Sequence, residues 1–334
     1  MRGMKRLAPA ALLALLAWGA TASAQTADWH PLKVQSGGNG KSQIADYVPL
    51  AKASKPWMVC TSFPHMKDPF FLAANYGMVQ EARRLGVRVQ TLDAGGYAGL
   101  NTQISQIENC VAGGADAVVM VAIARDGMGN LLAKLKAKGI PVVDAVNGVS
   151  SPDVSARVLT SPRDEGLRAG QYLARKHPAG GKPARVAWLP GPAGAGFVEA
   201  FNAGFQEGIK GSAVVVAETK HGDVGKEVQA RLVEDLLQTH KDLDYVVGTA
   251  VMAEAAVPLL KARKLQDRVK LVSVYMTPGV YAHLKAGNVE AAGATPVALT
   301  GRIMLDTAVR LLEKKLEMQE VNTIGRTYTS AEVG

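Results

Sequence analysis

The sequence predicts an α/β protein made of two lobes, each built around a parallel sheet. Its 334 residues are enough for two units that each bury a core, since domains usually hold roughly 100–200 residues. Short apolar runs alternate with amphipathic helical stretches, a pattern typical of parallel sheets covered by helices. The alternation pauses over residues 147–162, which are rich in Ser, Pro and Asp, and then restarts. We therefore expect the chain to cross between the two lobes there.

The N-terminus has the pattern of a cleavable export signal. An apolar stretch from Leu7 to Ala20, too short to span a bilayer, lies between a positive segment and the small-residue site Ala22-Ser23-Ala24. A buried core helix is the alternative, but the order of these three features favours a signal cleaved after Ala24. Losing three positive and no negative residues lowers the formal charge from +9 to +6. We expect a periplasmic protein with no membrane span of its own.

Each expected lobe has its own series of elements. The first series has strands at Trp57–Ser62, Val87–Leu92, Ala117–Val121 and Pro141–Val146, and helices at Phe70–Leu85, Leu100–Ala112 and Gly127–Lys138. The second has strands at Ala184–Leu189, Ala213–Glu218, Tyr245–Gly248, Val269–Tyr275 and Val289–Ala294, and helices at Glu165–Lys176, Phe197–Ile209, Lys226–His240 and Val280–Lys285. A last helix, Val297–Glu317, is expected to return to the first lobe. The resulting division is a leader at 25–54, an N-terminal lobe at 55–158 plus 296–320, and a C-terminal lobe at 159–295 plus 321–334.

Composition and motifs favour a binding protein over an enzyme or a nucleic-acid-binding protein. The chain is 48% hydrophobic, which excludes a disordered protein, and its basic residues are scattered along polar helix faces. It has no phosphate loop, nucleophile elbow or metal-spaced Cys/His cluster, so we expect no catalysis, cofactor or metal. An exported enzyme could use the carboxylates of Asp68, Asp93 and Asp126, but no base–nucleophile pair accompanies them. The glycine-rich turn at 191–196 could bind an anion, although a tight entry into the next helix explains it better.

Aromatic residues gather in the turns where ligands of parallel sheets bind. Phe70 and Phe71 follow the first strand, and because they are adjacent, one of them is expected to point into the cleft between the lobes. Tyr97 follows the second strand, and Tyr275 ends a strand of the second lobe. With the carboxylate of Asp68 they would form a box for a cationic or methylated ligand. Ordinary packing is the alternative, and an aspartate before a proline also suits a helix N-cap.

The two cysteines are predicted to form a disulfide. Cys60 lies in the first strand, and Cys110 lies on the apolar side of the second crossover helix. If the strand order is second–first–third, that helix crosses over the first strand and brings the two thiols together. Export permits the bond, and two buried free thiols are the alternative.

Short segments spread over most of the mature chain match one family in the same order. These segments are Trp29–Val34, Lys67-Asp68, Asn75–Met78, Ala94–Tyr97, Gln106–Cys110, Leu189–Pro192, Gly248–Ala250, Ala253–Ala256 and Val272–Tyr275. Through them the chain resembles the type I periplasmic binding proteins and, more narrowly, the TorT family, whose members partner the sensor kinase TorS in trimethylamine N-oxide respiration. The resemblance implies two Rossmann-like lobes, joined by a three-segment hinge, that close on a small-molecule ligand without catalysis. It also implies docking on the periplasmic sensor domain of a histidine kinase.

The resemblance further implies a ligand and the residues that hold it. TorT proteins hold trimethylamine N-oxide in an aromatic cage with one polar contact, and Asp68, Tyr97 and Tyr275 match the residue types of that cage. The ligand-binding set expected for this chain is Asp68, Phe70, Phe71, Tyr97, Arg163 and Tyr275.

The chain departs from the family at three cage positions. Phe70 stands where a Tyr is usual, Phe71 where a Trp is usual, and Pro162, with Arg163 beside it, where the second lobe usually has a Trp. These changes remove a hydroxyl donor and two indole faces, so we expect the ligand to be trimethylamine N-oxide or a related small solute. The alternative function is a solute receptor for a sugar or similar molecule that serves an ABC transporter. The strand ends at 249–252 and 275–276 offer little to grip vicinal hydroxyls, which counts against a sugar.

Overall fold

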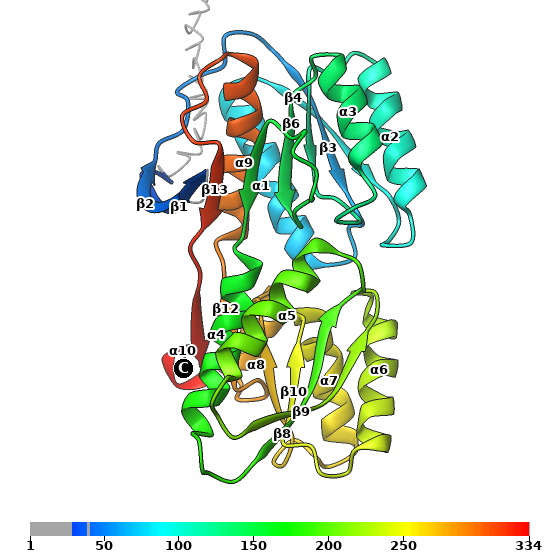
Figure 1. The fold of residues 1–334 in the computed structure, drawn as a ribbon, viewed down its shortest axis with the longest axis vertical. Coiled ribbons are helices and arrows are strands. Elements are labelled where there is room, and N and C mark those ends of the chain that lie inside the picture. The colour runs from blue at the N-terminus through cyan, green and yellow to red at the C-terminus, as the bar shows by residue number, and fades with distance from the viewer. Residues whose placement is uncertain (1–28, 39–40, 334) are drawn as a thin grey trace, which may run out of the picture.

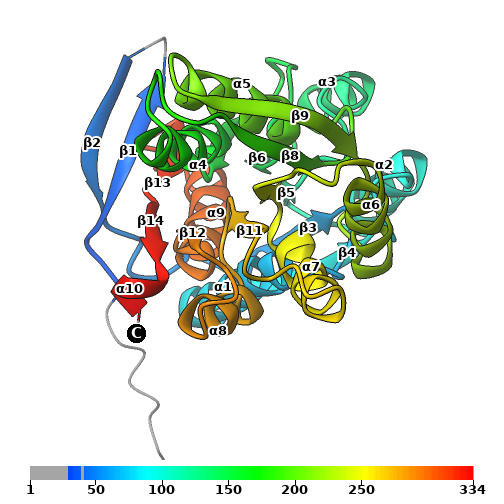
Figure 2. The ribbon, with the colours of Figure 1, turned by 90° about the horizontal axis from the view of Figure 1, so that it is seen from below.

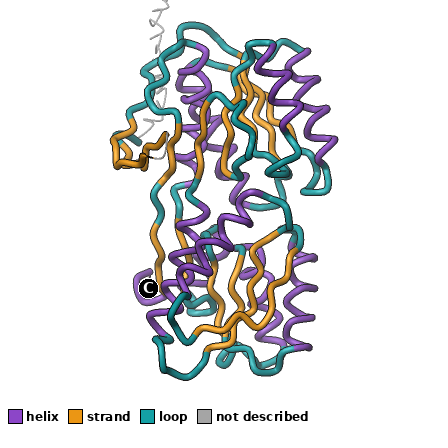
Figure 3. The backbone as a smooth tube through the Cα atoms, viewed as in Figure 1, coloured by secondary structure: helices purple, strands orange, loops and turns teal. Residues whose placement is uncertain are grey.

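The chain folds into two lobes stacked along the long axis of the molecule (Figure 1). The computed structural model describes residues 29–38 and 41–333, so the expected signal sequence at 1–24 lies outside the described residues. Each lobe holds one sheet with helices on both faces (Figure 3). The predicted α/β architecture is confirmed.

The first lobe is built on an eight-stranded sheet with the order β2-β1-β13-β7-β6-β5-β3-β4. Its strands are β1 (Leu32–Gly38), β2 (Lys41–Tyr47), β3 (Met58–Phe63), β4 (Arg88–Asp93), β5 (Ala117–Met120), β6 (Val142–Val146), β7 (Ala156–Leu159) and β13 (Glu320–Thr323). All neighbours from β13 to β4 are parallel, whereas β1 is antiparallel to both β13 and β2. The order β4-β3-β5 is the second–first–third arrangement that the disulfide prediction requires.

Helices cover both faces of this sheet because its central strands are apolar on both sides. Helices α1 (Pro69–Leu85) and α9 (Val297–Leu312) pack on one face, and α2 (Leu100–Ala112) and α3 (Gly129–Ala137) pack on the other. Side chains along a strand alternate between the faces. In β3, Val59 therefore joins the core beneath α1 and α9, while Cys60 joins the core beneath α2 and α3.

The second lobe is built on a six-stranded sheet with the order β14-β12-β11-β10-β8-β9. Its strands are β8 (Ala184–Gly191), β9 (Val214–His221), β10 (Tyr245–Gly248), β11 (Lys270–Ser273), β12 (Ala291–Ala294) and the antiparallel β14 (Arg326–Thr329). Helices α4 (Pro162–Lys176) and α5 (Gly196–Ile209) lie on one side of this sheet, as the view from below in Figure 2 shows. On the other side lie α6 (Lys226–Thr239), α7 (Ala250–Ala262) and α8 (Pro278–Lys285), with α10 (Ser330–Val333) at the edge.

Several elements were not expected from the sequence. Helix α7 is buried over most of its surface and contains Pro258, so it lacks the one-sided apolar pattern by which a helix is predicted. Strands β1 and β2 form a hairpin within the segment expected to be a leader. Strand β13 pairs in the first sheet and β14 in the second, so the last crossing falls between Thr323 and Arg326, and α9 ends at Leu312.

Three segments connect the lobes, as the resemblance implied. They join β7 to α4, β12 to α9, and β13 to β14 (Figure 1). In the first of them Ser161 has a φ of 53°, a left-handed conformation that is rare for a residue other than glycine. In the third, a Cβ on Gly325 would lie 2.6 Å from the carbonyl oxygen of Ala294 and 2.9 Å from Oγ1 of Thr295. The second and third segments are thus packed backbone against backbone.

Glycines let α4 and α5 approach each other unusually closely. Gly166 and Gly170 on α4 face Gly204 and Gly208 on α5. A Cβ on Gly204 would lie 1.8 Å from the carbonyl oxygen of Arg163, a distance that no packed structure tolerates. The two helices therefore form one rigid wall at the hinge side of the second lobe.

The predicted disulfide between Cys60 and Cys110 is present, with 6.5 Å between the two Cα atoms. It forms because α2 follows β4 and crosses back over β3, which turns Cys110 toward the face of the sheet that Cys60 occupies. Within residues 29–38 and 41–333, no helix is long and apolar enough to cross a membrane.

Candidate ligand-binding site

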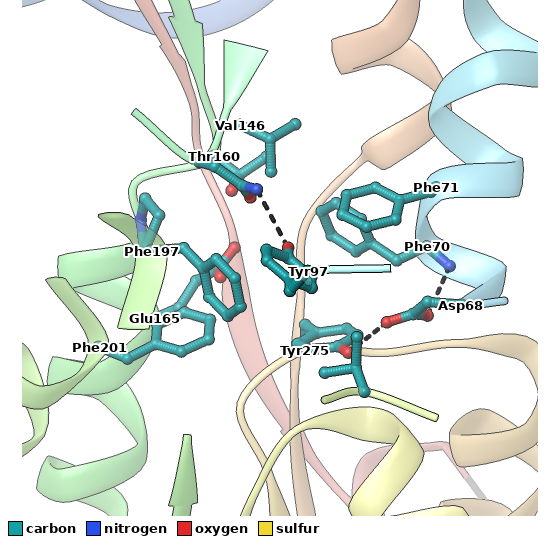
Figure 4. Close-up of a pocket in the computed structure, with 13 residues that line it drawn as sticks. Asp68, Phe70, Phe71, Tyr97, Val146, Thr160, Glu165, Phe197, Phe201 and Tyr275 are labelled. Atoms are coloured by element: carbon teal, nitrogen blue, oxygen red, sulfur yellow. Dashed lines mark hydrogen bonds between the residues drawn. The ribbon is translucent and has the colours of Figure 1, made fainter. Parts of the chain in front are cut away.

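A small cavity lies between the lobes, where the carboxyl ends of the two parallel sheets face each other. Its volume is about 30 Å³, which corresponds to about two water molecules. Six aromatic rings form much of its wall, and Figure 4 shows them surrounding one space. The lining residues are Asp68, Phe70, Phe71, Tyr97, Val146, Asn147, Thr160, Pro162, Glu165, Phe197, Phe201, Val224 and Tyr275.

Asp68 joins the two lobes at this cavity. One carboxylate oxygen accepts a hydrogen bond from the backbone N–H of Phe70 at 2.9 Å and so caps α1. The other accepts from the hydroxyl of Tyr275, in the second lobe, at 2.5 Å (Figure 4). Burial raises the pKa of Asp68 to about 6, although these two hydrogen bonds oppose the shift. The N-cap and the ligand-site interpretations are therefore compatible.

The rings of the two lobes contact each other edge to face. Phe70 packs on Tyr275 with ring centroids 5.2 Å apart, and on Phe71 at 5.8 Å. Tyr97 packs on Phe197 of the second lobe at 5.9 Å. Such tilted contacts leave ring faces available to a ligand. Both Phe70 and Phe71 line the cavity, as in the ligand-binding set expected from the resemblance, whereas their adjacency alone predicted only one of them there.

Tyr97 is fixed by a neighbour at the end of β6. The amide Nδ2 of Asn147 donates to the hydroxyl of Tyr97 at 3.0 Å and to the carbonyl of Ala122 at 2.7 Å. Burial raises the pKa of Tyr97, so its hydroxyl stays protonated. Val146, which precedes Asn147, has a φ of 60°, a backbone conformation that is strained for a β-branched residue. Such strain tends to occur at binding sites, where the surrounding fold enforces it.

Five of the six predicted ligand-binding residues line this cavity, namely Asp68, Phe70, Phe71, Tyr97 and Tyr275. The sixth, Arg163, does not: its side chain is half exposed on α4 and pairs with Glu207 of α5. Pro162 occupies the wall in its place, because α4 begins there and turns the next side chain outward.

Sequence reasoning missed Phe197, Phe201 and Glu165 of the second lobe and Asn147 of the first. Phe197 and Phe201 are one turn apart near the start of α5, the helix that follows the carboxyl end of β8. Asn147 likewise follows β6 directly. These positions at strand ends were the available signal. Glu165 gave no such signal, because it lies inside a helix whose register on the cavity depends on the close α4–α5 packing.

The lobes also touch around the rim of the cavity. The backbone N–H of Arg125 donates to the carbonyl of Gly194 at 3.2 Å, and its side chain pairs with Glu199 at 3.2 Å. His65, fully buried in the first lobe, lies 3.8 Å from a carboxylate oxygen of Asp223 in the second. The glycine-rich turn at 191–196 thus leads into α5 and contacts the opposite lobe.

Fold and site together define a two-lobed ligand-binding protein that is closed around a small chamber. A family model described as "Periplasmic binding protein domain" matches residues 59–316, so the chain belongs to the periplasmic binding proteins. More narrowly, it is a TorT-like type I periplasmic binding protein. It is 35% identical over 262 residues to periplasmic protein TorT of Escherichia coli K12, which covers 78% of this chain and 75% of TorT.

Two solved structures are similar over most of the chain. An ABC transporter solute-binding protein from Bradyrhizobium sp. BTAi1, with bound Bis-Tris, is 50% identical with a TM-score of 0.77, covering 92% of this chain and 94% of that one. TorT in the ligand-free complex with the TorS sensor domain is 31% identical with a TM-score of 0.75, covering 82% of this chain and 93% of that one. Relatives of this fold therefore include both a transport receptor and a sensor partner.

Proposed function

We propose that this protein is a periplasmic sensor subunit. It binds trimethylamine N-oxide or a related small methylated solute between its lobes and regulates the periplasmic sensor domain of a membrane histidine kinase. It acts by binding alone, without catalysis or a cofactor. The observation that carries the proposal is the aromatic chamber, closed by the bond from Tyr275 to Asp68.

Size and lining both favour a small methylated ligand over a sugar. The chamber of about 30 Å³ holds about two water molecules, so even a ligand of a few heavy atoms enters only when the lobes open slightly. A pentose or hexose requires much more space and several free polar partners. Here the hydroxyl of Tyr275 and the amide of Asn147 are already used within the protein. Aromatic faces are the surfaces that attract methylated nitrogen.

The same relationship supports the proposed partner and location. TorT forms a complex with the TorS sensor domain, and this chain shares 31% identity with that TorT structure over 82% of its length. Export is required for this role, so the mature chain is periplasmic and begins at Gln25 after cleavage behind Ala24. Mass spectrometry of the protein from the periplasmic fraction tests this start site, and an intact N-terminus would contradict it.

Ligand class is tested by thermal denaturation of the mature protein with trimethylamine N-oxide, tetramethylammonium, ribose or glucose. A ligand at 100 times its Kd stabilises the native state by about 2.7 kcal/mol. At roughly 2–4 °C per kcal/mol, this raises Tm by about 5 °C or more. Tyr275→Ala should abolish the shift, and the exposed Tyr281 of α8 provides the matched control Tyr281→Ala, which should keep it. A shift with a sugar alone would refute the proposal.

A transport receptor is the second candidate, since the Bradyrhizobium protein at 50% identity is a solute-binding protein of an ABC transporter. Binding to an immobilised, purified periplasmic sensor domain of a TorS-type kinase discriminates between the two. A sensor subunit should be retained on that domain and respond to ligand. If the purified chain binds a small solute but never a kinase sensor domain, the transport function is favoured.

A further inference from the structure

The chamber contains a second buried carboxyl group that sequence reasoning did not single out. Glu165 of α4 lines the cavity from the second lobe and is only 3% exposed. It accepts a hydrogen bond from Oγ1 of Thr295, in a hinge segment, at 2.6 Å. In Figure 4, Glu165 and Asp68 lie on opposite sides of the ring cluster. Each lobe therefore contributes one carboxyl group to the same aromatic chamber.

The charges around these two groups do not balance. Within the described chain no Lys or Arg lines the chamber. Arg168, on the same helix as Glu165, attracts its negative charge, while Asp164 repels it. Asp68 is repelled by Glu254 of α7, and among the described residues no cation acts on it. Glu254 is itself paired with Lys226 at 3.4 Å. When Asp68, Glu165 and Asp164 are all ionised, the single guanidinium of Arg168 therefore leaves two negative charges to be compensated.

The pKa values of both carboxyl groups are raised, as expected for buried acids that lack a compensating cation. Burial raises the pKa of Glu165 to about 7 and the pKa of Asp68 to about 6. A cation placed between them would favour the ionised forms and lower both pKa values. Binding of a cation would consequently release protons near neutral pH.

Hydrogen-bond donors, in contrast, are scarce in the chamber. An N-oxide oxygen needs a donor, but Tyr275 already donates to Asp68, and both amide hydrogens of Asn147 are in use. Phe70 and Phe71 carry no donor, so the donors that remain in the lining are the hydroxyls of Thr160 and of Tyr97, which accepts from Asn147. A methylated ammonium ion needs none, because ring faces and carboxylates stabilise it directly. The lining therefore suits a positive ligand better than a neutral N-oxide.

We propose that the ligand of this chamber is a small methylated ammonium cation, and that Glu165 is the residue that selects the cation over the neutral N-oxide. This inference rests on the proposed function and narrows its ligand class. A monocation held between the carboxylates of the two lobes also draws the lobes together, since it is attracted to both walls at once.

The test is calorimetric titration of the mature protein with tetramethylammonium chloride and with trimethylamine N-oxide at pH 6 and pH 8, at constant ionic strength. At pH 8 the cation should bind at least about tenfold more tightly than the N-oxide. Its affinity should fall by roughly tenfold at pH 6. That pH lies about one unit below the pKa of Glu165, so about nine-tenths of the Glu165 carboxyl groups are protonated and have no charge to attract the cation. An N-oxide held by a protonated carboxyl would show the opposite pH dependence.

Glu165→Gln should weaken binding of tetramethylammonium by about tenfold or more and reduce its pH dependence, while leaving the affinity for the N-oxide unchanged or higher. Glu207→Gln, on the exposed face of α5, is the matched control and should bind as the unmodified protein does. Tighter binding of the N-oxide than of the cation, or a cation affinity indifferent to pH and to Glu165→Gln, would overturn the inference but not the proposed function. Heat from a pentose or hexose alone would overturn both. If Glu165→Gln does not fold, the pH dependence of tetramethylammonium binding to the unmodified protein still tests the inference.

Discussion

Gly204→Ala tests whether the close approach of α4 and α5 builds the second wall of the chamber. The added Cβ would lie 1.8 Å from the carbonyl oxygen of Arg163 and 2.7 Å from the backbone nitrogen of Leu167. Neither atom belongs to a flexible side chain, so the helices must separate by more than 1 Å to restore contact distance. Overpacking of this kind costs about 1–3 kcal/mol or more. At roughly 2–4 °C per kcal/mol, we expect Tm to fall by roughly 2–12 °C.

Ligand binding should weaken in the same variant, because α4 carries Glu165 and α5 carries two rings of the chamber. The control is Gly129→Ala at the start of α3, where a Cβ would meet no atom within 4 Å. An alanine there should be neutral or stabilising by up to about 1 kcal/mol. Urea unfolding followed by circular dichroism measures both variants. Equal stability of the two would refute the packing argument.

Three further predictions concern single contacts. Replacing both Cys60 and Cys110 with alanine should cost on the order of 4 kcal/mol in urea unfolding, since the bond closes a loop with a separation of 50 residues. Tyr275→Phe should cost about 1–3 kcal/mol at pH 8, because the buried carboxylate of Asp68 loses its donor, and less below pH 6, where that carboxyl is protonated. Burial lowers the pKa of His65, so the unfolded chain binds more protons and the contribution of His65 to stability is lost as pH falls below about 6.5. His65→Phe should remove that dependence, and an unchanged pH profile of the unfolding midpoint would contradict it.

Local patterns in the sequence were sufficient to predict most of the fold. Apolar runs of strand length and amphipathic helices depend on neighbouring residues only, and their alternation indicates a parallel sheet. The disulfide between Cys60 and Cys110 was predicted from the place of Cys110 on the apolar side of its helix and from an assumed strand order, which the sheet confirms. Elements without a local signal were missed. Helix α7 is apolar on nearly all sides, and β13 and β14 are short strands that are stable only through their partners.

Most of the chamber residues that the sequence predicted lie in the first lobe, with Tyr275 as the exception, and most of those that it missed lie in the second, with Asn147 as the exception. Asp68, Phe70 and Phe71 are consecutive or nearly so at one strand end, so their proximity is a property of the chain itself. Glu165 reaches the chamber only because α4 packs closely on α5, and Arg163 turns away for the same reason.

The sequence by itself determined the two lobes, the disulfide and the presence of an aromatic cluster at the strand ends, since these depend on periodicity and on the order of elements. Only the tertiary structure decided how the lobes close. The hydrogen bond from Tyr275 to Asp68 joins residues 207 positions apart. The position of the Asp68 and Glu165 carboxyl groups on opposite sides of the chamber depends on how the two whole lobes are placed relative to each other. Such placement results from packing between distant segments. No local pattern in the sequence encodes it.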